Sequence, residues 1–92
     1  MTLGRILVVD DEPQIRRFLR PALAAAGYDV IEAENGADAI KAAATSAPDV
    51  IILDLGLPDM DGKDVIANLR GWSTLPIIIL SARDRETEKI AA

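Results

Sequence analysis

The stretch Val50-Ile51-Ile52-Leu53-Asp54-Leu55-Gly56-Leu57-Pro58 decides the fold of this 92-residue chain. Its first four residues are apolar without interruption, as expected of a strand that is covered on both faces. An aspartate ends the run, and a loop with glycine and proline follows. Two more runs have the same character, at residues 6–9 and 76–80. Together they predict three strands of a parallel sheet that is covered by helices on both faces.

Segments with helical periodicity separate these strands, at residues 13–26, 37–46 and 61–70. The first segment spaces its apolar residues along one helical face, namely Ile15, Phe18, Leu19, Ala22, Leu23 and Ala26. Pro13 suits the first turn of that helix and Gly27 suits its C-terminal stop. We expect the helix to continue through Pro21, because the apolar face continues on both sides of it, although an interior proline costs about 3 kcal/mol.

Residues 28–34 add another strand, and residues 84–92 are typical of the opening turns of a fourth helix. The order of elements is therefore β-α-β-α-β-α-β-α. Right-handed crossovers convert that order into an α/β fold, a doubly wound open parallel sheet. We expect the flavodoxin-like strand order 2-1-3-4, in which the first and third strands are neighbours. No linker or repeat divides the chain, so residues 1–92 are expected to form one domain.

The composition limits the chemistry available to the chain. It has no Cys and no His, which excludes thiolate metal sites, disulfides and histidine-based catalysis. With 10 basic and 15 acidic residues the net charge is −5, which argues against direct nucleic-acid binding. No apolar run approaches the ~20 residues of a membrane helix, and no secretion signal opens the chain. We therefore expect a cytoplasmic chain that itself binds neither nucleic acid nor membrane.

Acidic residues and a hydroxyl follow the strands at one edge of the predicted sheet. Asp10 and Asp11 follow the first strand, Asp54 ends the third, and Ser81 follows the fourth. Because neighbouring parallel strands meet at a switch point in strand order, these residues should share one crevice. Carboxylates this close repel one another unless a cation lies among them, and oxygen ligands without His or Cys select a hard ion such as Mg²⁺. A carboxylate beside that ion can attack phosphorus and become an aspartyl phosphate, and the hydroxyl can donate to a phosphoryl oxygen.

A plainer interpretation is open for each acid taken alone, because aspartate is common in turns and at helix N-caps. We assign Glu12, Asp59 and Asp61 to solvated or capping roles. For the set formed by Asp10, Asp11 and Asp54 the functional interpretation is favoured. Turn chemistry alone does not explain a pair of acids after one apolar strand and a single acid at the end of another.

Three motifs resemble the receiver domain of bacterial two-component response regulators. They are Val8-Val9-Asp10-Asp11-Glu12, Leu53-Asp54-Leu55-Gly56-Leu57-Pro58-Asp59-Met60-Asp61-Gly62 and Leu80-Ser81-Ala82-Arg83. The second and third motifs are similar to the Kdp-type branch of the regulators that are transcription factors. The resemblance implies that a sensor histidine kinase phosphorylates Asp54 in a Mg²⁺-dependent reaction. It also implies a phosphoacceptor with at most weak self-catalysed phosphotransfer and dephosphorylation, whose full-length parent controls transcription through a DNA-binding effector domain.

The resemblance further implies a role for each matching residue. Asp11 and Asp54 would bind Mg²⁺ through carboxylate oxygens, and Gly56 would bind it through its backbone carbonyl. Asp10 would act on the metal mostly through a bound water. Ser81 matches the switch hydroxyl that turns toward the phosphoryl oxygen.

Against the family pattern of five β/α units, residues 1–92 are expected to be a C-terminally truncated receiver domain. They offer no match to most of the fourth helix or to the fifth strand and helix. The family's phosphate-contacting lysine and its switch aromatic belong to that fifth strand, so we expect impaired phosphotransfer. The alternative hypothesis is a non-catalytic fragment that forms homo-oligomers through the edge of the strand at residues 76–80, because exposed apolar edges recruit other strands.

Overall fold

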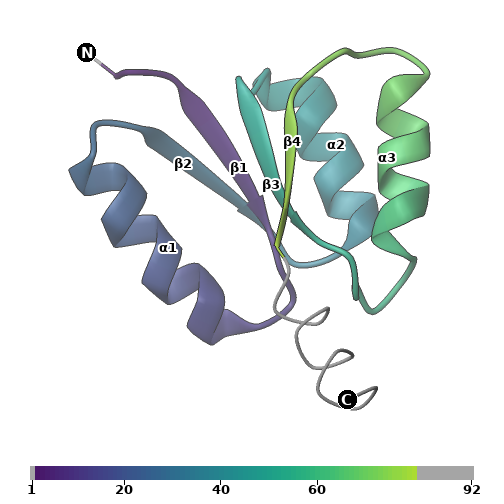
Figure 1. Ribbon diagram of the computed structural model, residues 1–92, viewed down its shortest axis with the longest axis horizontal. Helices are drawn as coiled ribbons and strands as arrows, with labels where there is room; N and C mark the ends of the chain where they lie inside the picture. The colour runs from purple at the N-terminus through teal and green to yellow at the C-terminus, as the bar shows by residue number, and fades with distance from the viewer. Residues whose placement is uncertain (1, 81–92) are drawn as a thin grey trace, which may run out of the picture.

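The computed structural model describes residues 2–80, which form four strands and three helices (Figure 1). In chain order these are β1 (Arg5–Val9), α1 (Pro13–Ala25), β2 (Asp29–Ala33), α2 (Gly36–Ser46), β3 (Val50–Asp54), α3 (Gly62–Arg70) and β4 (Ile77–Leu80). Each of these elements was predicted from the sequence, with bounds that differ by at most one residue at either end. Ser81 and the helix predicted at residues 84–92 lie outside the described residues.

The strands form a single parallel sheet in the order β2-β1-β3-β4, as predicted. Val9 pairs with Ala33 on one side and with Leu53 on the other, and Leu53 pairs in turn with Ile79. The carboxyl ends of the four strands therefore lie at the same edge of the sheet. The chain passes from β1 to β2 on one side of β1. It then crosses back over β1 and forms β3 on the other side, so β1 and β3 are adjacent.

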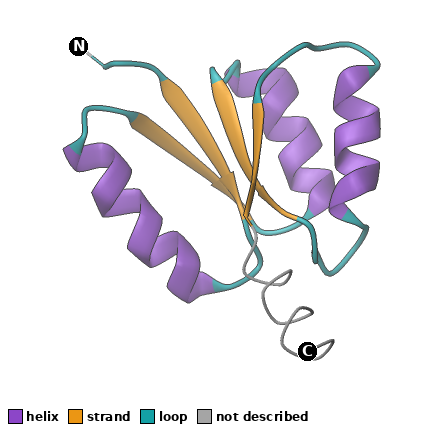
Figure 2. Cartoon of the chain, viewed as in Figure 1, coloured by secondary structure: helices purple, strands orange, loops and turns teal. Residues whose placement is uncertain are grey.

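Helices cover both faces of the sheet, with α1 on one side and α2 and α3 on the other (Figure 2). The larger core cluster lies under α2 and α3. Its fully buried members are Leu7, Val9, Ala39, Ile51, Leu53, Val65 and Leu69. The smaller cluster lies under α1 and is built on Ile6, Val8 and Val30. Burial on both faces explains why β1 and β3 are apolar without alternation. The same expectation is wrong for the run that forms β4, because that strand lies at the edge of the described sheet and none of its residues is buried.

Helix α1 continues through Pro21, as predicted. Leu19 and Leu23 pack on the smaller core cluster on either side of the proline, and this packing offsets the local cost of an interior proline. The predicted apolar face is too wide, however, because the Phe18 side chain is 71% exposed. The contact between α1 and the sheet is therefore a narrow stripe, which leaves Phe18 beside it in solvent.

Side-chain caps begin the other two helices. The Asn35 side-chain oxygen accepts a hydrogen bond from the Asp38 backbone N–H at 2.8 Å, which caps α2 as predicted. Asp61 caps α3 by accepting from the Lys63 backbone N–H at 3.0 Å. This contact confirms the capping role that we assigned to Asp61.

Within the described residues, β4 pairs with β3 alone and forms one edge of the sheet. Its Ile78 and Ile79 are 55% and 36% exposed. None of the helices in residues 2–80 combines the length and the apolar character needed to cross a membrane.

Candidate functional site

Asp10 is the first residue beyond β1, and it is almost completely buried at 3% exposure. Its backbone N–H donates to the Ala33 carbonyl at 3.1 Å, which continues the β1–β2 ladder by one step. Its side-chain Oδ1 accepts a hydrogen bond from the Glu12 backbone N–H at 2.8 Å. The sheet and the following turn together hold this carboxylate in place.

A cluster of three acids forms at this turn. Asp10, Asp11 and Glu12 each present a carboxylate oxygen, and these oxygens lie within 4.8 Å of one another. Asp11 was predicted in this position, but Glu12 was assigned to a solvated or capping role. Glu12 does occupy the N-cap position of α1, yet its side chain makes no capping hydrogen bond there. Glu12 is exposed, in agreement with the solvated role assigned to it, and the turn that follows Asp10 brings its carboxylate into the acidic cluster.

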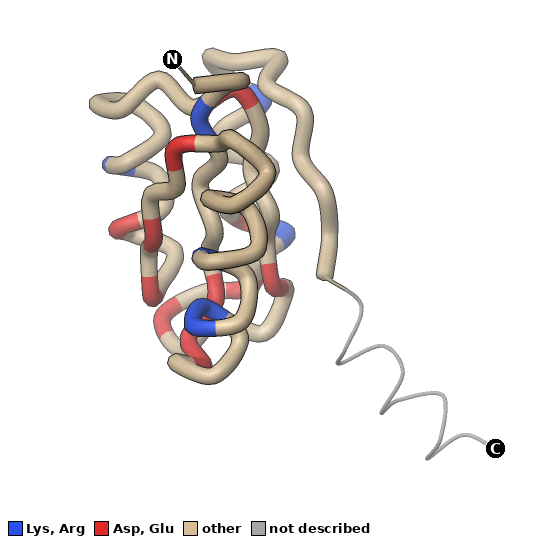
Figure 3. The backbone as a smooth tube through the Cα atoms, turned by 90° about the vertical axis from the view of Figure 1, so that its left-hand side faces the viewer, with Lys and Arg blue, Asp and Glu red and all other residues tan. Residues whose placement is uncertain are grey.

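Asp54 is the last residue of β3 and is also buried, at 4% exposure. The register pairs Val9 with Leu53, so the residues that follow, Asp10 and Asp54, lie at adjacent positions of the sheet edge. Asp54 Oδ1 accepts a hydrogen bond from the Gly56 backbone N–H at 3.2 Å. Figure 3 shows acidic positions gathered at the lower end of the molecule, where the strands finish.

The burial of Asp10 raises the pKa of its carboxyl group above the usual value, because burial disfavours the charged form. The hydrogen bond from the Glu12 backbone N–H opposes this rise in pKa. The negative charges of Asp54, Asp11 and Glu12 add to it. The folded chain therefore places mutually repelling charges around a buried acid.

The loop between β3 and α3 is tied to the neighbouring helix α2. The Asp59 carboxylate accepts hydrogen bonds from the backbone N–H groups of Gly36 and Ala37, at 2.7 and 2.9 Å. These bonds hold the pKa of Asp59 below its usual value. The capping role assigned to Asp59 is thus confirmed, although the helix that it caps is α2, whose first two residues precede it by more than twenty positions.

Gly62 allows α3 to begin close to the candidate site. Its N–H donates to the Leu55 carbonyl at 2.9 Å. A Cβ at this position would lie 2.7 Å from the Leu55 Cα and 3.1 Å from the Asp54 carbonyl oxygen. Glycine is therefore required by close backbone approach rather than by an unusual dihedral angle.

The donor set at this edge suits a hard divalent cation. All the side-chain groups of Asp10, Asp11, Glu12 and Asp54 are carboxylates, and no softer ligand can compete, since the chain has no His or Cys. A cation would also relieve the repulsion among these charges. The loop after Asp54 supplies Gly56, whose backbone carbonyl was predicted as a further ligand. Ser81, the predicted hydroxyl of the site, lies outside the described residues.

Comparison with known proteins agrees with this geometry. The model of the family described as "Response regulator receiver domain" matches residues 6–92. The chain is a member of the response regulator receiver domain family. Receiver domains are phosphoacceptors rather than classical enzymes, they generally bind Mg²⁺ at an acidic pocket, and they act with sensor histidine kinases.

A curated relative of this receiver domain is the transcriptional regulatory protein KdpE of Mycobacterium tuberculosis. The two are 59% identical over 92 residues, which is 100% of this chain and 40% of the relative. The match supports the Kdp-type assignment made from the sequence. It also means that this chain spans well under half the length of the full regulator.

Two solved structures show the same fold. The N-terminal domain of a response regulator receiver protein from Methanoculleus marisnigri JR1 has a TM-score of 0.84 and 31% identity, with 88% of this chain and 68% of that chain covered. A chain in the crystal structure of histidine kinase ThkA in complex with response regulator protein TrrA has a TM-score of 0.79 and 41% identity, with coverages of 89% and 70%.

Proposed function

We propose that this receiver domain accepts a phosphoryl group on Asp54 from a sensor histidine kinase. Mg²⁺ would be held by carboxylate oxygens of Asp11 and Asp54 and by the Gly56 carbonyl, with Asp10 acting mostly through a bound water. The observation that carries the proposal is the meeting of two buried acids, Asp10 and Asp54, beside the carboxylate cluster that begins at Asp10.

The residues of the chain perform distinct parts of this reaction. A carboxylate oxygen of Asp54 attacks the phosphorus, a new O–P bond forms, and the bond from phosphorus to the donor breaks. The Gly56 N–H, which donates to Asp54 Oδ1, orients that carboxylate. A bound Mg²⁺ supplies positive charge that offsets the charge developing on the phosphoryl oxygens. The Ser81 hydroxyl is proposed to donate to one of those oxygens.

The proposal extends to the longer protein that the relatives represent. By its similarity to KdpE, the parent would be a cytoplasmic regulator that controls transcription through a separate effector domain. Residues 1–92 would then be an incomplete receiver domain within that parent. The crystal structure of ThkA with TrrA supports a histidine kinase as the phosphoryl donor. Any self-catalysed phosphotransfer or dephosphorylation by this chain would be weak.

Family membership favours this function over the alternative of a non-catalytic fragment. Self-association through β4 is compatible with either function. The exposure of Ile78 and Ile79 keeps it as a separate prediction about assembly.

The test is to incubate the chain with Mg²⁺ and acetyl phosphate and to follow its intact mass. We expect a slow gain of one phosphoryl group that disappears with EDTA and in Asp54→Asn. Asp61→Asn is the matched control, because Asp61 belongs to the same loop but caps α3, and asparagine also caps helices. Labelling of wild type and Asp61→Asn, but not of Asp54→Asn, supports the proposal. The absence of any Asp54-dependent mass gain would refute the proposed phosphorylation of this chain.

A further inference from the structure

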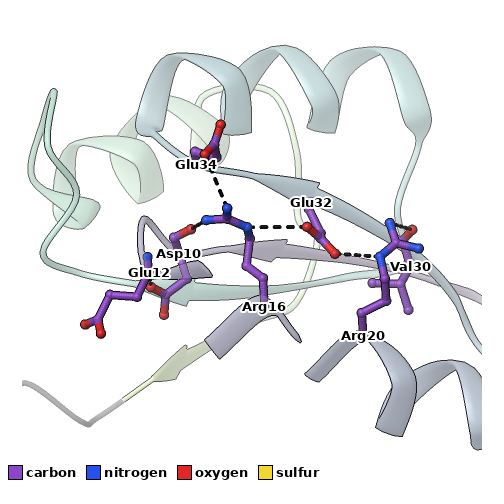
Figure 4. A network of polar contacts seen from close by, with 7 residues as sticks. All are labelled: Asp10, Glu12, Arg16, Arg20, Val30, Glu32 and Glu34. Atoms are coloured by element: carbon purple, nitrogen blue, oxygen red, sulfur yellow. Dashed lines mark hydrogen bonds and ion pairs between the residues drawn. The ribbon is translucent and has the colours of Figure 1, made fainter. Parts of the chain in front are cut away.

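Arg16 lies at the centre of a polar network between α1, β2 and the acidic turn (Figure 4). Its guanidinium donates to the Asp10 backbone carbonyl at 2.6 Å and to Glu34 Oε1 at 3.2 Å. Its Nε lies 3.3 Å from Glu32 Oε1. The side chain is only 12% exposed, so this arginine is held from three directions and largely shielded from water.

The contact with Asp10 reaches the backbone of the candidate site. β1 ends at Val9, so the Asp10 carbonyl belongs to the peptide group that leads directly into Asp11. The Asp10 carbonyl accepts from Arg16, while the Asp10 side chain accepts from the Glu12 N–H at 2.8 Å. The Asp10 carboxylate is therefore held by the turn, and the Asp10 carbonyl is held by Arg16 from α1.

Arg20 stands one helical turn further along α1 and offers a close comparison. It also pairs with Glu32, at 2.5 Å, and it also donates to a backbone carbonyl, that of Val30 at 3.2 Å. That carbonyl belongs to the second residue of β2, which pairs with Ile6 near the start of β1, whereas the acidic turn follows the end of β1. Arg16 and Arg20 thus share a helix, an acidic partner and a type of backbone contact, but only Arg16 touches the turn (Figure 4).

We propose that Arg16 is a positioning residue for the metal site, which fixes the peptide between Asp10 and Asp11 and thereby the direction of their carboxylates. The inference rests on the proposed Mg²⁺-dependent function. Groups that orient metal ligands without touching the metal commonly change metal affinity by about 10–100-fold when they are removed. Glu34 and Glu32 serve this arrangement by holding the guanidinium against the carbonyl.

Charge and position make opposite predictions about the loss of Arg16. If the arginine acted only as a positive charge near the site, its removal would leave the acids less neutralised and would strengthen the binding of a cation. If it fixes the turn, its removal lets the carboxylates reorient and weakens binding. The sign of the change in the dissociation constant for Mg²⁺ therefore separates the two roles.

The test compares Arg16→Met, Arg16→Lys and Arg20→Met by calorimetric titration with Mg²⁺. We expect the dissociation constant to rise about tenfold in Arg16→Met and at least threefold in Arg16→Lys, because a lysine cannot span the Asp10 carbonyl and both glutamates. In Arg20→Met it should change by less than threefold. Chemical denaturation, followed by the fluorescence of the single Trp72, reports stability separately.

The possible outcomes discriminate clearly. Unchanged or tighter Mg²⁺ binding in both Arg16 variants overturns the inference, as does an equal loss in Arg20→Met. If Arg16→Met does not fold, Arg16→Lys decides. If the wild-type chain itself shows no Mg²⁺ binding, the proposed function fails instead, and the two failures are thereby distinguished.

Discussion

Asp10 and Asp54 occupy adjacent positions at the carboxyl ends of β1 and β3, and both are buried. The pairing of Val9 with Leu53 one residue earlier enforces this neighbourhood, so it is a property of the sheet rather than of mobile loops. The negative charges of these two buried carboxylates repel each other, and Asp11 and Glu12 add to the local charge. The fold therefore carries an electrostatic cost at this edge, which a bound cation would offset.

Asp10→Asn is expected to stabilise the chain in the absence of Mg²⁺. Asparagine has nearly the same shape, and its carbonyl oxygen can still accept from the Glu12 N–H, but the repulsion with Asp54 is removed. Thermal unfolding in EDTA measures the effect, and a gain of 1 kcal/mol would raise the midpoint by roughly 4–8 °C in a domain of this size.

In the presence of Mg²⁺ the wild-type chain should have the higher unfolding midpoint, and Asp10→Asn the lower one. The wild-type midpoint rises with Mg²⁺ because ligand binding stabilises the folded state, whereas Asp10→Asn gains little. A lower unfolding midpoint for Asp10→Asn than for wild type in EDTA would show that charge repulsion at Asp10 does not destabilise the chain.

The elements of this fold could be predicted from local signals. Apolar runs such as residues 50–53 and the helical spacing of Leu19 and Leu23 are readable in the sequence, and right-handed crossovers between such elements predict a doubly wound parallel sheet. The exposure of Phe18 could not be predicted in this way. Periodicity gives the direction of a helical face but not how wide a stripe the sheet will cover.

The candidate site was predicted less completely, because its contacts join distant segments. The positions of Asp10, Asp11 and Asp54 follow from where the strands end. By contrast, Asp59 caps a helix that precedes it in the chain, and Arg16 reaches two glutamates and a carbonyl on other elements. A helical arginine beside an acidic turn resembles any solvated charge until the tertiary contacts are known.

Asp59 makes the stability of the chain depend on pH in the acidic range. Its pKa is lowered in the folded state because the Gly36 and Ala37 N–H groups bind its charged form. A carboxylate with a lowered pKa contributes stability that is fully present above its unfolded value near 3.8 and is lost as the pH falls through the folded value. We therefore expect Asp59→Asn to flatten the decline in stability below about pH 4.

Urea denaturation at a series of pH values from about pH 2 to about pH 7 measures how the free energy of unfolding depends on pH. Asp64→Asn is the matched control, since it removes an equal charge from the exposed first turn of α3. A pH profile of Asp59→Asn that matches those of wild type and Asp64→Asn would contradict the prediction.

Gly62→Ala should destabilise the chain by about 1–3 kcal/mol, because the new Cβ meets the Leu55 backbone and must displace the start of α3. Gly71→Ala, at the other end of the same helix, is the control. The backbone of Gly71 is already in the right-handed helical region, with φ −68°. A Cβ added there would lie no closer than 3.3 Å to a neighbouring atom, the Asn68 carbonyl oxygen. Its free energy of unfolding should therefore change by less than about 1 kcal/mol. Equal effects from the two substitutions would refute a special role for close approach at Gly62.

The edge formed by β4 is expected to drive concentration-dependent self-association. Ile78 is 55% exposed on a strand that, within residues 2–80, pairs on one side only, and such edges add further strands. Ile78→Lys places a charge on that edge and should weaken association at least tenfold, by roughly 1.4 kcal/mol or more. Phe18→Lys removes an apolar side chain that is even more exposed, at 71%, but lies on α1, so it should leave association unchanged. Sedimentation velocity over a range of concentrations distinguishes these cases, and a wild-type chain that stays monomeric, or an equal loss in both variants, would rule out pairing through β4.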